Sequence, residues 1–149
     1  NIIFILKYTN MLQAKSLSLI VVSLLLSANL LSQNRDMENK SPVEIAAMQA
    51  EKLQRDLKLE DYQVFLVDSV LQSNIEGSYK EFEKMRSAGI QSTDSYRELQ
   101  LRWRTKTEDA FMKFMTREQF ERYLKITGIS RKERAEVMKR FDNYKSSKN

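Results

Sequence analysis

The residue types that carry most enzymatic and metal chemistry are missing from this sequence. Its 149 residues include no histidine and no cysteine, which excludes a serine–histidine–aspartate triad, thiol chemistry and most zinc sites. Acidic pairs remain, such as Glu60 with Asp61 and Glu81 with Glu83, but carboxylates so placed on a charged helix are typical of solvated surface. There is also no glycine-rich phosphate loop. We therefore predict a protein that is not an enzyme and that binds neither a metal ion nor a cofactor.

The best candidate for a binding surface is the segment around the single tryptophan. Five cations surround Trp103: Arg97, Arg102, Arg104, Lys106 and Lys113. The nearby acids Glu98, Glu108 and Asp109 only partly neutralise them. On a helix, Arg102, Lys106 and Lys113 share one face. One interpretation is a basic surface that attracts acidic, unfolded client proteins through long-range charge and then holds them by apolar contact. The other is an ordinary solvated helix face with one core tryptophan. Both interpretations stay open.

The first part of the chain has the pattern of an export signal. Residues 1–10 lack an initiating methionine and are interpreted as non-native upstream residues. Lys15 then precedes an apolar run over residues 17–31 and an abrupt change to polar residues; this is the order of a signal peptide, predicted over residues 11–32. A membrane anchor is the alternative, but a spanning helix needs roughly 20 apolar residues. We expect a cleaved signal peptide, a flexible tail over residues 33–40 and a periplasmic protein.

The composition of the remaining chain favours one all-α domain. Only three glycines and one proline occur in the whole sequence, and no alternating strand pattern of useful length is present. The domain is expected over residues 41–145, with a frayed tail at residues 146–149. Of the 25 cations, Lys7 and Lys15 precede Ser32, whereas all 20 acids follow it, so the mature chain has a net charge of only +3. That excess is too small to indicate nucleic-acid binding.

Capping residues and apolar spacing predict four to five helices. The first begins at a capping box formed by Ser41 and Glu44, and the others are expected over about residues 61–86 and 94–114, after Thr116, and after Ser130. Gly89 is expected at the left-handed C-cap position after the second helix, and Ser130 with Glu133 forms a capping box for the last. Met48, Tyr79 and Ala135 are placed on the apolar faces of their helices. The second helix has more apolar surface than one short hairpin can cover, which predicts a homodimer. Without disulfides, the stability of the domain must come from helix packing, to which dimerisation would add.

One pattern recurs at two helix junctions. An apolar residue closes one helix, and a glutamine lies three residues after the cap position of the next: Leu59-Glu60-Asp61-Tyr62-Gln63 and Met115-Thr116-Arg117-Glu118-Gln119. In the second copy Thr116 can accept from the Gln119 backbone N–H while the glutamine side chain reaches back. Such a cap stabilises the turn by about 1 kcal/mol. We take Leu59, Gln63, Met115, Thr116 and Gln119 as the motif residues.

These junctions resemble the L-T-x-x-Q motif of the Spy and CpxP family of bacterial periplasmic proteins. The resemblance covers about Ser41 to Tyr144 and is closest to versions from Bacteroidetes. The matching segments are Ser41-Pro42-Val43-Glu44, Leu57-Lys58-Leu59-Glu60-Asp61-Tyr62-Gln63 and Met115-Thr116-Arg117-Glu118-Gln119-Phe120. Glu60 stands where the family has threonine, so the first copy of the motif is interpreted as degraded.

The resemblance implies curved antiparallel helical hairpins that dimerise into a cradle. It also implies an ATP-independent chaperone for unfolded envelope proteins or, alternatively, a regulatory protein that docks a membrane sensor. Metal-binding relatives rely on histidines and cysteines that this chain lacks. A more remote alternative is a basic amphipathic protein whose apolar stripes face an anionic membrane. The expected partners are therefore unfolded or specific partner proteins and a second copy, with weak membrane-surface contact as a possibility and no nucleic acid.

Overall fold

The computed structural model describes residues 40–148. Over these residues the chain forms five helices and no strand, which confirms the predicted all-α fold: α3 (Pro42–Leu57), α4 (Asp61–Ser87), α5 (Thr93–Phe114), α6 (Arg117–Ile126) and α7 (Arg131–Ser146). The predicted upstream residues, the signal peptide and nearly all of the tail lie outside the described residues.

The helix boundaries follow the predicted caps. The backbone N–H of Ser41 donates to the Glu44 carboxylate at 2.8 Å, and the Glu44 N–H donates back to the Ser41 hydroxyl at 3.3 Å. The capping box predicted for the last helix forms in the same way at the start of α7. After α4, Gly89 has a φ of 73°, a left-handed conformation that glycine adopts without steric cost. Helix α7 continues to Ser146, one residue beyond the expected domain.

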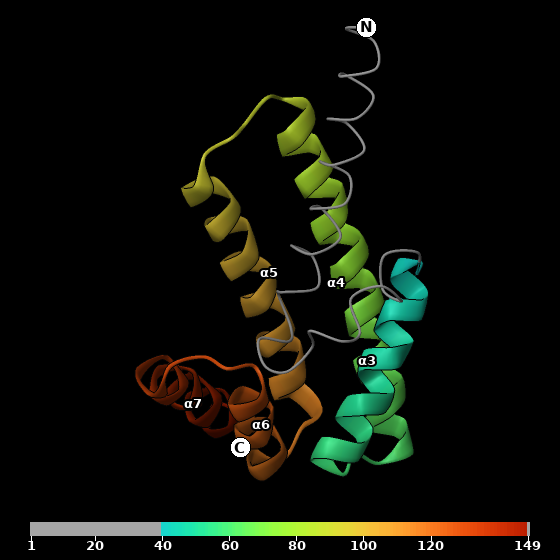
Figure 1. The fold of residues 1–149 in the computed structure, drawn as a ribbon. Coiled ribbons are helices and arrows are strands. Elements are labelled where there is room, and N and C mark those ends of the chain that lie inside the picture. Colours follow the sequence, from blue (N-terminus) through green and yellow to red (C-terminus); the bar gives the residue numbers. More distant parts are fainter. Residues whose placement is uncertain (1–39, 149) are drawn as a thin grey trace, which may run out of the picture.

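The five helices double back so that two junctions meet at one end (Figure 1). Helix α3 packs against the first half of α4, and the chain then reverses so that α5 returns beside the second half of α4. Helix α6 lies at the foot of α5, where it contacts α3, and α7 packs against α6. The α3–α4 junction and the α5–α6 junction therefore lie side by side.

The apolar side chains form two separate cores. The main core lies at the end where the junctions meet and combines residues from all five helices. A smaller core, which we call the tip core, lies between α4 and α5 near their connection and contains Phe82, Leu99 and Trp103. Between the two cores, Asn74 Nδ2 donates to Thr107 Oγ1 at 2.9 Å. The hairpin of α4 and α5 is therefore apolar at both ends and polar between them.

Three residues that were placed on apolar helix faces are exposed, so these predictions are wrong. Met48 is 40 % exposed and Tyr79 is 47 % exposed, and Ala135 is also exposed. In α3 the buried stripe is rotated toward the small residues Ala46 and Ala50, which allow close approach of α4. Tyr79 lies on a part of α4 that has only α5 as a neighbour, and α7 buries only one side. Spacing alone does not define how many neighbours a helix has.

Candidate functional site

The two predicted junctions meet through their glutamine side chains. Gln63 Nε2 lies 2.8 Å from Gln119 Oε1, and Gln119 Nε2 lies 3.0 Å from Gln63 Oε1. Each amide nitrogen also donates to a backbone carbonyl that precedes the other junction. For Gln63 this is the carbonyl of Phe114, at 3.0 Å, and for Gln119 it is the carbonyl of Lys58, at 3.3 Å. The two amides thus bridge the α3–α4 and α5–α6 junctions directly.

Each glutamine also caps its own helix. Gln63 Oε1 accepts from the backbone N–H of Glu60 at 3.0 Å, and Gln119 Oε1 accepts from the backbone N–H of Thr116 at 3.0 Å. Both donors and both acceptor sites of each amide are therefore used. The first copy had been interpreted as degraded because Glu60 replaces threonine, but its glutamine bonds in the same way. The reason is that the bond uses a backbone N–H, which glutamate supplies as well as threonine.

The predicted motif residues come together as a structural unit. Leu59 and Met115 are 6 % and 1 % exposed and belong to the main core, whereas Gln63 is 2 % exposed. Gln119 is half-buried, and Thr116 is exposed with its hydroxyl accepting from the Gln119 N–H at 3.2 Å. Buried amides with saturated hydrogen bonds offer no free group to a ligand. The junctions therefore fix the geometry of the helices.

The cations predicted to bind clients have different surroundings. Arg97 forms an ion pair with Asp94 in the same helix, and Arg102 pairs with Glu81 of α4. Lys113 is exposed and has no ion-pair partner among residues 40–148. These cations lie on the surface of α5, but neighbouring acids neutralise two of the three. The segment is therefore not a continuous basic patch.

Trp103 is a core residue, as the second of the two interpretations proposes. Its side chain is 9 % exposed and packs in the tip core. Lys106 Nζ lies 3.7 Å from the centroid of the indole ring, a cation–π contact that covers the outer face of the ring. The indole packs so closely against α4 that only a glycine, Gly77, fits beneath it. Trp103 therefore stabilises the hairpin and is covered by Lys106.

Arg104 belongs to a partly buried charge network that the sequence did not reveal. Its Nε lies 3.4 Å from a carboxylate oxygen of Glu108, which is 1 % exposed. The other oxygen of Glu108 lies 3.2 Å from Arg140 Nη1 in α7, and Arg140 also pairs with Asp109. Arg104 Nη2 lies 3.5 Å from Glu133, again in α7. This network connects α5 to α7.

Burial raises the pKa of the Glu108 carboxyl, although Arg104 and Arg140 act in the opposite direction. Burial also raises the pKa of the Tyr123 hydroxyl, and the negative charge of Glu108 adds to that effect. A carboxyl whose pKa is higher in the folded than in the unfolded chain binds its proton more readily when folded. Its contribution to stability is therefore fully present below the unfolded value and is lost as the pH rises through the folded value.

This linkage predicts how Glu108→Gln changes stability with pH. At pH 7 the free energy of unfolding of the variant is expected to be lower by about 1–2 kcal/mol. The loss is no larger because Arg140 keeps Asp109 as a partner and Arg104 keeps Glu133. The gap between the parent chain and the variant should widen as the pH falls toward the unfolded value near 4.5, because only the parent gains stability by protonation. Urea unfolding of both proteins at several pH values measures this difference in the free energy of unfolding. If the difference becomes smaller on acidification, the pKa of Glu108 is not raised by folding.

Several large apolar side chains are exposed, and the sequence did not identify them as a site. Seven large apolar residues are between 38 % and 71 % exposed, and all of them precede residue 102: Val43, Met48, Tyr62, Phe65, Tyr79, Ile90 and Leu101. Phe65 is the most exposed, at 71 %, and lies one helical turn after Tyr62 on α4. The apolar stripe of this helix was noticed in the sequence, but spacing alone did not separate its buried from its exposed members.

Residues 40–148 contain no group of three or more acidic, histidine or cysteine side chains that could hold a metal ion. None of the helices that the structure describes is long and apolar enough to cross a membrane. No protein-family model, curated protein or solved structure matches this chain.

Proposed function

We propose that this protein is an exported, ATP-independent, chaperone-like protein that holds unfolded envelope proteins. The observation that carries the proposal is the set of exposed apolar side chains on α3, α4 and α5, headed by Phe65 and Tyr62. In a small helical protein with a net positive charge, such side chains provide weak apolar contact for segments that a folded client would bury. Holding by such contacts needs no nucleotide.

Charge and shape support the same function. Lys106 and Lys113 are exposed on α5 and belong to no ion pair within residues 40–148. Their charges attract acidic clients over a longer range than apolar contact does, whereas Arg97 and Arg102 contribute less because Asp94 and Glu81 pair with them. The paired glutamine junctions hold α3 beside α4 and α6 beside α5, so the exposed apolar side chains are presented by a defined scaffold. The resemblance of these junctions to the Spy and CpxP family favours the same function, together with a homodimer in the periplasm.

The proposal predicts that aggregation of unfolded proteins is delayed by a chain that begins at Gln33. The double variant Tyr62→Ser/Phe65→Ser should require about tenfold more protein for the same delay, because it loses two large apolar contacts. Both positions are exposed, so the fold should change in stability by no more than about 0.5 kcal/mol per site. Light scattering with several chemically unfolded proteins measures the delay, and sedimentation of the same samples gives the oligomeric state.

The matched control is Glu136→Ser/Asn143→Ser, which changes two exposed residues of α7 and should suppress aggregation as the parent does. If the parent chain at stoichiometric excess delays no aggregation, the proposed function is wrong. Saturable binding of one membrane sensor without general suppression would instead identify a regulatory protein.

A further inference from the structure

Charge is unevenly distributed along the described chain. Residues 117–148, which contain α6 and α7, have 10 cations and 5 acids, whereas residues 40–116 have 12 cations and 13 acids. The small net charge of the whole chain thus combines a basic C-terminal segment with a nearly neutral segment before it. A separation of this kind produces a local positive potential that the net charge does not indicate.

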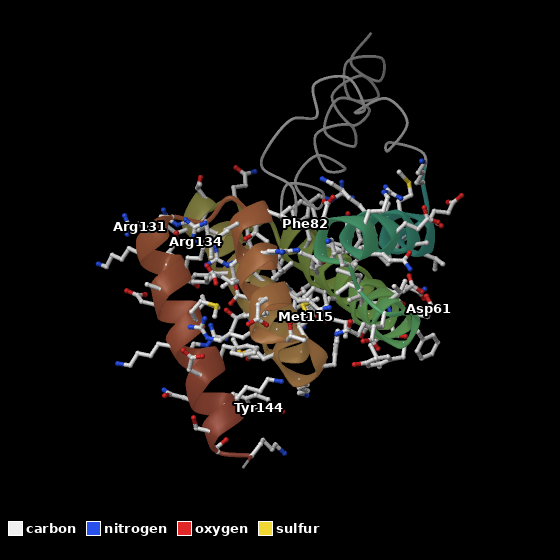
Figure 2. All side chains as sticks on the ribbon, turned by 90° about the horizontal axis from the view of Figure 1, so that it is seen from below. Asp61, Phe82, Met115, Arg131, Arg134 and Tyr144 are labelled. Carbon is white, nitrogen blue, oxygen red and sulfur yellow. The ribbon has the colours of Figure 1, made fainter. Side chains whose placement is uncertain are left out.

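We use the name basic face for five cations of α6 and α7 that have no ion-pair partner in the part of the chain that the structure describes: Arg122, Arg131, Lys132, Arg134 and Lys139. At helical spacing Arg131, Lys132 and Lys139 lie within about 100° of one another around α7, so these three share one side of the helix. Arg134 is half-buried and the other four are exposed. Figure 2 shows Arg131 and Arg134 at one end of α7, far from Asp61 at the start of α4. Three of the five acids of α6 and α7 are engaged in ion pairs: Asp142 with Arg117, Glu121 with Lys125 and Glu133 with Arg104. Glu118 and Glu136 are left to offset the five cations.

Part of this charge opposes the stability of its own helix. Arg131, Lys132 and Arg134 lie in the first turn or just after it in α7, where the helix dipole is positive and favours acids. Glu133 offsets the effect through the capping box with Ser130. Folding by itself therefore does not favour cations at these positions.

The basic face also lacks the apolar anchors of a protein interface. Every large apolar side chain that is exposed in residues 40–148 lies at or before Leu101, and the apolar residues Val137 and Phe141 of α7 are buried. Tight protein partners usually bury aromatic or aliphatic anchors at the centre of the contact. A surface that offers only flexible cations on two helices instead fits a surface of diffuse negative charge. Lipid headgroups provide such a surface, and each lysine or arginine near it strengthens binding.

We propose that the basic face of α6 and α7 adsorbs electrostatically to anionic lipid headgroups, without insertion into the bilayer. The exposed apolar side chains of α3, α4 and α5 then stay free, since none of them belongs to the basic face. This inference goes beyond the proposed function and does not depend on it.

The experiment uses the chain that begins at Gln33, which contains every helix and both cores that the structure describes. Vesicles of phosphatidylcholine that contain about one third phosphatidylglycerol should bind this chain at low salt, and vesicles of phosphatidylcholine alone should not. The triple variant Arg131→Glu/Lys132→Glu/Lys139→Glu should lower the partition coefficient about a hundredfold, because each cation contributes roughly a factor of five. Acids near the start of α7 also suit its dipole, so the variant should fold.

The matched control is Lys52→Glu/Arg55→Glu/Lys84→Glu, which changes the net charge equally but on α3 and α4. We expect its partition coefficient to stay within about threefold of the parent value at about 0.1 M salt, where the Debye length is only about 10 Å and charges outside the basic face are largely screened from the membrane. Equal losses in the two variants would overturn the proposal in favour of net charge alone. Binding that persists at about 0.3 M salt, where screening is strong, would overturn it in favour of apolar insertion.

Duplex DNA tests the remaining alternative. If DNA binds the chain more tightly than the anionic vesicles do at the same salt concentration, the face is a nucleic-acid surface and the proposal is wrong. The basic-face variant should still delay aggregation as the parent does. Failure of lipid binding is therefore distinguishable from failure of the proposed function.

Discussion

Replacing Gln63 by alanine is expected to lower the free energy of unfolding by about 3 kcal/mol. The side chain is 2 % exposed, and its amide makes four hydrogen bonds across the two junctions. Its loss leaves the Phe114 carbonyl, the Glu60 N–H and the Gln119 amide without their partner, because alanine has no polar side-chain group. A buried polar group that loses its partner costs about 1–3 kcal/mol. Urea unfolding monitored by circular dichroism measures the change.

The partner glutamine gives a sharper form of this test. Gln119→Ala should cost less than Gln63→Ala, because Gln119 is only half-buried and water can reach the groups left behind. The double variant should cost at least about 1 kcal/mol less than the sum of the single variants, since each substitution already removes the bonds between them. Gln72→Ala is the control. Gln72 bonds only to Asp68, four residues earlier on the same helix, at 2.8 Å, so we expect a change of about 0.5 kcal/mol. Additive costs for Gln63 and Gln119 would show that the two side chains act independently.

Helix boundaries were predictable because their signals are local. The capping boxes at Ser41 and Ser130 and the left-handed glycine at Gly89 each depend on residues a few positions apart, and the structure confirms all three. The all-α class followed from composition for the same reason. Such signals act within one turn of helix, so the residues that are neighbours in the sequence are enough to identify them.

Contacts between helices were not predictable in the same way. Each glutamine was identified as a cap for its own helix, but the contact between Gln63 and Gln119 joins residues 56 positions apart. Glu108 was noted only as an acid that reduces the charge around Trp103. Its spacing to Arg104 is visible in the sequence, whereas its contact with Arg140 depends on where α7 packs.

The candidate binding residues illustrate the same limit. Around Trp103, helical spacing placed several cations on a shared face. The acids that lie opposite these cations depend on how α4 and α7 pack against α5. Glu81 of α4 reaches Arg102, and Glu133 of α7 reaches Arg104. The exposure of Phe65 depends likewise on how α3 and α5 cover α4. Amphipathic spacing defines a stripe, and the neighbours decide which part of it is buried.

Gly77→Ala is expected to destabilise the protein by about 2 kcal/mol, although alanine is the better helix former by about 1 kcal/mol. Gly77 lies inside α4, and a Cβ atom there would lie 2.2 Å from Cη2 of Trp103 and 2.9 Å from both Cζ2 and Cζ3. The indole is rigid and is packed in the tip core, so the two helices must separate to admit a methyl group. Trp103 is the only tryptophan, and its fluorescence should shift to longer wavelength as water reaches it.

Removing the indole should reverse the sign of this effect. In a Trp103→Leu background, which is itself destabilised, the space above Gly77 is open, and Gly77→Ala should stabilise the chain by up to about 1 kcal/mol. Circular dichroism replaces fluorescence as the readout there. Ser73→Ala, at an exposed position of the same helix, is the control and should stabilise both backgrounds by a few tenths of a kcal/mol. If Gly77→Ala stabilises the parent chain as Ser73→Ala does, the close contact between Gly77 and Trp103 does not exist. A reversal of sign between the two backgrounds would show that the size of one side chain on α5 explains the glycine in the middle of α4.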